Sequence, residues 1–214
     1  AYAATADYPI FCKPLSASNG LYAEVIDSAE EFADYLHRVA REHFAILVQP
    51  YVRAPEHRVF VLNGSPLFSY AKTLPNIIGD GERTLAQLVA ATQKDPEAPR
   101  LKPRGRDRRG VKVRANDTPA QDAIITLDGP ANRSAGGGVS ELRDGAPDPL
   151  ARIAVNAAQA IGLSLAAVDV FWPPSQEPVV IEVNSNPMIA TLEDNQRWGL
   201  ITDIWRANLE AALR

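Results

Sequence analysis

Two neighbouring apolar segments near the C-terminus, each interrupted by polar side chains, constrain the fold of this chain most strongly. The segment VVIEVNSNP places Glu182 and Asn184 two residues apart after an apolar run. Because side chains alternate along a strand, both point to the same face. The preceding apolar segment, AAVDVFW, carries Asp169 in mid-strand. If the two strands pair antiparallel, the three oxygen-bearing side chains meet on one face of a sheet.

The spacing alone leaves the role of these three side chains open. Burying unpaired carboxylates is costly, so a positive group is expected between them. A divalent cation held by Asp169, Glu182 and Asn184 is one interpretation, because Mg²⁺ prefers oxygen ligands. An ion pair with a nearby Arg or Lys is the alternative, as is a solvent-facing side of the sheet.

The rest of the chain predicts runs of strands with helices packed on one side, which is an α+β arrangement. Ser28 with Glu31, and Thr84 with Gln87, have the spacing of capping boxes that begin helices. Residues 95–119 are rich in Pro, Arg and Lys and are expected to be irregular. The last helix is expected to turn four apolar side chains inward, namely Trp198, Ile201, Trp205 and Leu209.

Composition excludes several classes of protein. The chain has 214 residues, 46% of them hydrophobic and 22% charged, which is typical of a globular protein of one or two domains. A net charge of -4 argues against a nucleic-acid partner. A single cysteine, Cys12, excludes an internal disulfide and favours a cytoplasmic location. No apolar stretch approaches the roughly 20 residues that cross a bilayer, so no membrane partner is expected.

Two segments nearer the N-terminus have features of a nucleotide site. Lys13 ends a predicted strand before the turn SASNG, where backbone N–H groups suit a phosphate; an ordinary exposed lysine is the alternative. The segment LVQPYVRAPEHR leaves a strand, so a purine could lie against backbone groups at Pro50 and Val52 with Glu56 on the ribose. A solvated strand connection explains that segment equally well. Neither a P-loop nor a dinucleotide fingerprint occurs.

A strongly basic run, RLKPRGRDRRGVKVR, covers residues 100–114. It suits a solvated loop or an anion-binding lid, because guanidinium groups bind phosphate and carboxylate. Nucleic acid is the least favoured partner, since no aromatic residues are interleaved to stack bases. Further on, Asn132 and Arg133 precede three glycines. Glycines let a backbone approach a ligand closely, but they also simply form loops.

Taken in order, YPIFCKP with SASNG, ILVQPYVRAPEHRVFVLNG, and AAVDVFW with VVIEVNSNP resemble the ATP-grasp superfamily of carboxylate–amine ligases. NIIGDGERTLAQLV and ANRSAGG are similar to the branch that holds cyanophycin synthetase, bifunctional glutathione synthetase and the ribosomal-protein glutamate ligases. The resemblance implies an α+β ATP-grasp fold, with two subdomains whose antiparallel sheets grip ATP. Residues 1–52 would be part of the lid subdomain. Residues 53–214 would form the C-terminal catalytic subdomain, with a basic insertion at 95–119. The N-terminal substrate domain usual in this superfamily is expected to be missing.

The resemblance also implies an activity, ATP-dependent amide or peptide bond formation through an acylphosphate, which yields ADP and phosphate. It implies ATP and Mg²⁺ (or Mn²⁺) as cofactors and a small-molecule or peptide carboxylate and amine as substrates, with a homo-oligomer or a missing N-terminal domain as further partners. A catalytically incomplete fragment that binds nucleotide or a partner is the alternative. The implied nucleotide contacts are Lys13, Ser18, Gly20, Gln49, Pro50, Val52 and Glu56. The implied phosphate or acyl contacts are Arg58, Lys72, Asn132 and Arg133, and the implied metal ligands are Asp169, Glu182 and Asn184.

Overall fold

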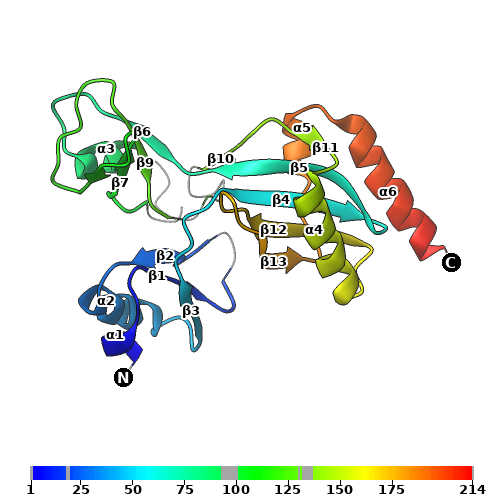
Figure 1. Cartoon of the computed structure of the whole chain (residues 1–214), viewed down its shortest axis with the longest axis horizontal. Helices are drawn as coiled ribbons and strands as arrows, with labels where there is room; N and C mark the ends of the chain where they lie inside the picture. Colours follow the sequence, from blue (N-terminus) through cyan, green and yellow to red (C-terminus); the bar gives the residue numbers. More distant parts are fainter. Residues whose placement is uncertain (1, 18–19, 93–100, 130, 132–136, 214) are drawn as a thin grey trace. The chain divides into compact units, whose positions relative to one another are not determined.

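The computed structural model describes residues 2–17, 20–92, 101–129, 131 and 137–213 (Figure 1). The chain forms two compact units. The first unit combines Ala1–Val52 with Thr73–Gly138, and the second combines Arg53–Lys72 with Val139–Arg214. The assignment of residues 1–52 to a lid and of residues 53–214 to a catalytic subdomain stays a prediction, and the compact units group 73–138 with the N-terminal residues.

One part of the first unit is a three-stranded antiparallel sheet with the order β2-β1-β3, together with two helices. Its elements are α1 (Tyr2–Thr5), β1 (Ile10–Pro14), β2 (Glu24–Ile26), α2 (Ala29–Val39) and β3 (Ile46–Pro50). The predicted capping box begins α2, because the Glu31 amide donates to Ser28 Oγ at 3.2 Å. Apolar side chains of α2 then pack on one face of the sheet, where Ile10, Cys12 and Tyr35 are buried.

The other part of the first unit is a four-stranded antiparallel sheet with the order β6-β9-β7-β8. Its elements are β6 (Asn76–Ile78), α3 (Leu85–Thr92), β7 (Gly105–Asp107), β8 (Lys112–Val113) and β9 (Ile124–Leu127). The second predicted capping box begins α3, since the Thr84 amide donates to Gln87 Oε1 at 2.8 Å and the Gln87 amide donates to Thr84 Oγ1 at 3.3 Å.

The structure corrects the expectation that residues 95–119 are irregular, because β7 and β8 lie within them. These strands are too short and too rich in charge to give an apolar run, so strand patterns miss them. Gly105 permits the pairing of β7 with β9. A Cβ at Gly105 would lie 2.2 Å from the carbonyl oxygen of Thr126, so a larger residue would push the two strands apart.

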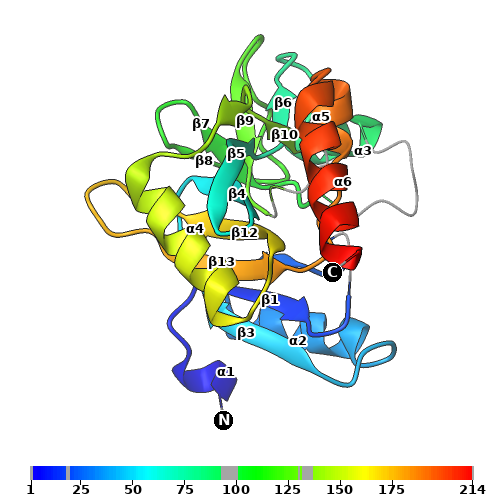
Figure 2. The same ribbon diagram turned by 90° about the vertical axis from the view of Figure 1, so that its right-hand side faces the viewer.

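The second unit is built on a six-stranded sheet with the order β10-β5-β4-β12-β13, and β11 pairs with β5. The β11–β5, β5–β4, β4–β12 and β12–β13 pairs are antiparallel. The strands are β4 (Glu56–Leu62), β5 (Ser65–Thr73), β10 (Gly138–Val139), β11 (Arg143–Asp144), β12 (Leu165–Phe171) and β13 (Val179–Asn184). The helices are α4 (Asp148–Ala160), α5 (Ala190–Asp194) and α6 (Trp198–Ala212). Figure 2 shows α4 and α6 on opposite sides of these strands.

Alternating side chains of β4 and β12 give this sheet two apolar faces. Val59 and Val168 are fully buried against α4. Phe60 and Phe68 stack on the other face, with ring centroids 4.1 Å apart, beside Leu192 of α5 and Ile204 of α6. Each fully buried side chain of this size contributes about 1.5–3 kcal/mol to stability. The sheet is therefore held rigidly from both sides.

Helix α6 differs from the sequence-based expectation. Its Ile204 is 3% exposed, and Ile201 packs against the same apolar cluster. Trp198, Trp205 and Leu209 are instead 60%, 59% and 61% exposed, so their predicted inward orientation is wrong. The helix carries apolar residues on two stripes, and periodicity alone does not show which stripe packs on the sheet. Within the described part of the chain, no helix is long and apolar enough to cross a membrane.

Candidate functional site

The acidic strand pair foreseen in the sequence is present in the second unit. Strands β12 and β13 pair antiparallel, with Asp169 directly opposite Glu182 and Ala167 opposite Asn184. Directly opposite residues share a face, so the three oxygen-bearing side chains lie on the same side of the sheet. The Asn184 amide nitrogen lies 3.5 Å from Glu182 Oε1 and 3.3 Å from the Ala167 carbonyl oxygen, and it can donate to both. The predicted pairing is confirmed.

Strand β4 brings an arginine to this face. Arg58 lies opposite Asp169 in the register of β4 and β12. Its Nε donates to Asp169 Oδ1 at 2.7 Å, and its Nη2 donates to Oδ2 at 2.6 Å. Asp169 is 1% exposed, so this is a buried, bidentate charge pair. The ion pair that spacing alone left as an alternative is therefore formed at Asp169.

Strand β5 adds a second cation. Lys72 lies opposite Glu56 in the register of β4 and β5, and its Nζ donates to Glu56 Oε1. The same ammonium donates to Asp169 Oδ2 at 3.0 Å. The Lys72 side chain is 7% exposed. Glu56, Arg58, Lys72 and Asp169 thus form one connected charged cluster, which is called the second-unit charge cluster below.

Burial and pairing act in opposite directions on the acids of this cluster. Burial alone would raise the pKa of Asp169, but hydrogen bonds from Arg58 and the charge of Lys72 lower it below the ordinary value. Burial raises the pKa of Glu56, and the charge of Asp169 adds to this, while Lys72 opposes it. The lowered pKa of Asp169 favours its ionised form, and its hydrogen bonds hold both Arg58 and Lys72.

The aromatic surroundings of this cluster were missed by the sequence-based reasoning. Tyr70 lies opposite Arg58 on β5 and is 6% exposed. Its ring is 6.4 Å from that of Phe68, measured between centroids. Apolar surroundings strengthen the electrostatic interactions of the charged side chains beside them. The strand alternation of SPLFSYAKT could have placed Tyr70 on the same face as Lys72, once the register with β4 was known.

The donor set of the acidic pair suits a divalent cation. Asp169 and Glu182 supply carboxylate oxygens and Asn184 supplies an amide oxygen, which are ligands that Mg²⁺ prefers. Among the residues that the structure describes, no group of three His, Cys, Asp or Glu side chains could hold a metal. This donor set has two carboxylates, and its third donor is the amide of Asn184. Arg58 and Lys72 already neutralise Asp169, and a cation would share this carboxylate with them.

The predicted nucleotide contacts of the first unit lie on β1 and β3. Lys13 is opposite Leu47, and Gln49 is opposite Phe11, in the antiparallel register of these strands. Cys12 and Val48 take the alternate positions and pack toward α2. Lys13 and Gln49 therefore share the sheet face that α2 does not cover.

The remaining predicted residues fall into two groups. Pro50 ends β3, Val52 follows it, and Gly20 has a φ of +72° in the turn between β1 and β2. A positive φ favours glycine, which explains the residue type at position 20 without a ligand. Ser18, Asn132 and Arg133 lie outside the described residues. The predicted nucleotide contacts that belong to the first unit are thus Lys13, Gly20, Gln49, Pro50 and Val52. The second-unit charge cluster belongs to the second unit.

Residues 131–206 match the model of the RimK-like ATP-grasp domain, and this range contains Asp169, Glu182 and Asn184. This part of the chain is similar to that domain family. The chain is also 28% identical over 222 residues to the glutathione biosynthesis bifunctional protein GshAB of Mannheimia succiniciproducens, covering 87% of this chain and 28% of that protein. With cyanophycin synthetase of Crocosphaera subtropica it shares 25% identity over 205 residues, covering 84% of this chain and 23% of that protein. These relatives confirm the branch that the sequence motifs resemble.

A solved structure has a similar fold. The D-alanine–D-alanine ligase of Bacillus anthracis superposes with a TM-score of 0.57 at 15% identity, covering 95% of this chain and 55% of that chain. Together with the match of residues 131–206 to an ATP-grasp family model, this superposition confirms the predicted α+β ATP-grasp fold with antiparallel sheets. The chain spans about a quarter of the length of the curated relatives reported above.

Proposed function

We propose that this chain is the ATP-grasp portion of an ATP-dependent carboxylate–amine ligase that forms an amide or peptide bond. The observation that carries the proposal is the face of the second-unit sheet where Asp169 and Glu182 lie opposite each other with Arg58 beside them. The relatives named as glutathione and cyanophycin synthesis proteins support an amide-forming activity. ATP and Mg²⁺ or Mn²⁺ are the proposed cofactors, and a cytoplasmic location stays a prediction.

The proposed reaction has two balanced steps. An oxygen of the substrate carboxylate attacks the γ-phosphorus of ATP, and the bond from that phosphorus to the β–γ bridging oxygen breaks, which releases ADP. The amine nitrogen then attacks the acyl carbon of the acylphosphate. The carbon–oxygen bond to phosphate breaks and the nitrogen loses a proton, which gives the amide and inorganic phosphate. Alignment of two anions that otherwise repel each other is the main task of the protein.

The second-unit charge cluster suits this task. Arg58 and Lys72 are both paired with the buried Asp169, so their positive groups are positioned before any ligand arrives. They are proposed to face the phosphates of ATP. Asp169, Glu182 and Asn184 are the proposed ligands of the divalent cation, which supplies neutralisation of phosphate charge when bound.

The remaining roles are assigned by resemblance. Lys13 is proposed to contact phosphates together with Ser18 and Gly20 of the following turn. Gln49, Pro50 and Val52 are proposed to hold the adenine, and Glu56 the ribose. The Glu56 carboxylate accepts a hydrogen bond from the Lys72 ammonium. To bind the ribose, Glu56 would have to accept a hydrogen bond from a ribose hydroxyl in place of that bond or beside it. Asn132 and Arg133 are proposed to contact the acyl intermediate.

A second candidate function is nucleotide or partner binding without catalysis. One observation favours it: the two cations of the cluster are already paired with Asp169 and Glu56, an arrangement that is complete without a ligand. Catalysis would require these cations to contact phosphate as well.

Turnover separates the two candidates. The chain is incubated with ATP, Mg²⁺ and a mixture of amino acids, and release of ADP is followed together with amide products by mass spectrometry. The ligase proposal expects ADP in equal amount to an amide, and loss of both in Arg58→Met. Nucleotide binding without any ADP release would favour the second candidate.

A further inference from the structure

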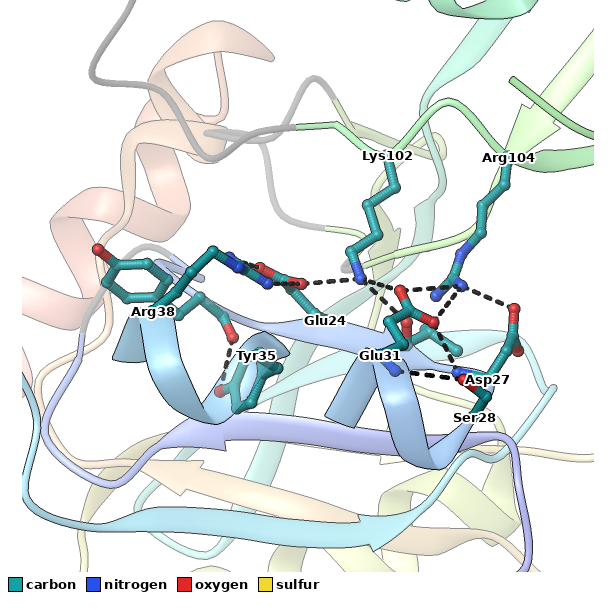
Figure 3. A network of polar contacts seen from close by, with 10 residues as sticks. Glu24, Asp27, Ser28, Glu31, Tyr35, Arg38, Lys102 and Arg104 are labelled. Carbon is teal, nitrogen blue, oxygen red and sulfur yellow. Dashed lines mark hydrogen bonds and ion pairs between the residues drawn. The ribbon is translucent and has the colours of Figure 1, made fainter. Parts of the chain in front are cut away.

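Six charged side chains of the first unit form a network that the proposed catalytic roles do not use (Figure 3). Three are carboxylates of β2, of the turn that follows it and of the first turn of α2, and three are cations. The carboxylates are Glu24, Asp27 and Glu31, and the cations are Arg38, Lys102 and Arg104. The charges therefore balance within the network.

Lys102 bridges two of the carboxylates. Its Nζ lies 2.8 Å from Glu24 Oε2 and 2.6 Å from Glu31 Oε1, and it also donates to the Val25 carbonyl oxygen at 3.3 Å. The three partners lie on β2 and in the first turn of α2. A single ammonium group thus joins the strand to the helix that follows it (Figure 3).

Arg104, two residues after Lys102, makes a second bridge. Its Nη1 donates to Asp27 Oδ2 at 2.7 Å and lies 3.2 Å from Glu31 Oε2. The amide of Asp27 also donates to Glu31 Oε2 at 2.9 Å, so the bridge is built directly on the capping box of α2. The Nε and Nη2 atoms of Arg104 are buried without a hydrogen-bond partner among the described residues. The burial of this arginine therefore depends on the carboxylates around Nη1.

The network is partly shielded from solvent. The side chains of Glu24, Lys102 and Arg104 are 13%, 23% and 18% exposed. Burial alone would raise the pKa of Glu24, but hydrogen bonds from Arg38 and Lys102 lower it. Burial likewise opposes the lowered pKa of Glu31, which follows from the hydrogen bond of Lys102 and the Asp27 amide. Pairs at such positions are screened less than fully exposed ones.

We propose that Lys102 and Arg104 form an electrostatic clasp that holds β2 and the first turn of α2 in place. Lys102 and Arg104 lie just before β7, a strand of the four-stranded sheet. Their carboxylate partners lie on or just after β2, a strand of the three-stranded sheet, so the clasp connects the two sheets of the first unit. It accounts for two cations of the basic run, which are bound to internal carboxylates. Neither an anion-binding lid nor a solvated loop describes these two residues.

The clasp also bears on the proposed phosphate contact. Cys12 lies opposite Glu24 in the register of β1 and β2, and Glu24 is one of the carboxylates that Lys102 binds. Lys13 is the next residue of β1 after Cys12. Lys102 and Arg104 are therefore positioning residues for the strand that carries Lys13. This second statement rests on the proposed function, whereas the clasp itself does not.

Hydrogen exchange of the full chain, followed by mass spectrometry without nucleotide, tests the clasp. The variants are Lys102→Met and Arg104→Met, and Lys102→Arg keeps the charge. Arg109→Met is the matched control, because Arg109 comes from the same basic run and its side chain is 84% exposed beside Asp107. Loss of the clasp is expected to speed exchange in residues 24–31 by about tenfold, while Lys102→Arg and Arg109→Met stay within about twofold of wild type.

Each outcome decides the proposal. Unchanged exchange in residues 24–31 of both Met variants, or an equal effect of Arg109→Met, would overturn the clasp. If a Met variant unfolds, exchange rises in every peptide and the exchange test fails. The free energies of unfolding of Glu31→Gln, Lys102→Gln and the double variant are then measured instead, and additive effects of the two changes would also overturn the clasp. In the ligase setting, the Met variants are expected to raise the KM for ATP by roughly threefold or more with little change in kcat. A clasp that passes the exchange test without any ATP binding would refute only the proposed function.

Discussion

Arg58 and Asp169 lie opposite each other on β4 and β12, and two guanidinium nitrogens hold both carboxylate oxygens at 2.7 and 2.6 Å. This pair is buried, and Lys72 joins it from β5. The positive groups proposed to face ATP are therefore positioned by a carboxylate that is also a proposed metal ligand. Stability and binding should respond together to changes at these three residues.

The first prediction concerns Arg58→Met. This change leaves Asp169 buried without its bidentate partner, so the free energy of unfolding should fall by about 3–5 kcal/mol. Urea denaturation followed by tryptophan fluorescence measures it, because Trp172, Trp198 and Trp205 all belong to the second unit.

Arg152→Met is the control for that change. Arg152 pairs with Glu177 where the two side chains are 68% and 82% exposed, and such pairs contribute about 0–1 kcal/mol. An equal loss of stability in the two variants would show that the buried pair has no special role.

The second prediction is a pH dependence. Because the pKa of Asp169 is lowered in the fold, its contribution to stability is complete above the ordinary value of 3.8 and is lost as the pH falls through the lowered pKa. Asp169→Asn should lose this contribution at all pH values. Its tryptophan-detected stability should therefore depend less on pH below 3.8 than that of wild type. Parallel stability curves below 3.8 would contradict the lowered pKa.

The third prediction contrasts two neighbours on α6. Ile204 is 3% exposed and packs on the apolar face of the sheet, so Ile204→Ala should lower the free energy of unfolding by about 2–5 kcal/mol. Trp205 is 59% exposed, so Trp205→Ala should lower it by about 1 kcal/mol or less. Thermal unfolding followed by circular dichroism compares the two. A larger loss for Trp205→Ala would mean that the helix packs with the other stripe inward.

The fourth prediction concerns the basic run and its short strands. Gly105→Ala would place a Cβ 2.2 Å from the Thr126 carbonyl oxygen, so β7 and β9 should separate. Faster hydrogen exchange in Ile124–Leu127 is the expected result. Gly199→Ala is the matched control, since a Cβ there meets nothing within 4 Å on α6 and should stabilise the helix by about 0.5–1 kcal/mol. Unchanged exchange in Gly105→Ala would contradict the close approach of the two strands.

The sequence predicted part of the candidate site for clear physical reasons. Strand alternation placed Asp169, Glu182 and Asn184 on one face, because an apolar run shows that a strand is buried and the period of two shows which residues share a face. It could not show that Arg58 fills the space beside Asp169. The two are 111 residues apart in the chain, and only the register of β4 and β12 brings them together.

Two other features could not be predicted from local patterns. The strands β7 and β8 have two or three residues each and lack an apolar run, so the pairing depends on Gly105 and on β9. Helix α6 has two apolar stripes, and the sheet covers the one that contains Ile204 and leaves Trp205 exposed. Both depend on tertiary contacts, which sequence periodicity does not contain.

Calorimetric titration of ATP into the full chain, with Mg²⁺ and with a chelator, tests the central claim most directly. Wild type should bind ATP in a Mg²⁺-dependent manner, and Glu182→Gln should weaken that binding by roughly tenfold or more. Glu177→Gln, at a side chain 82% exposed just before β13, should bind like wild type. Equal affinity with and without Mg²⁺, or no effect of Glu182→Gln, would contradict a nucleotide and metal site on this face of the sheet.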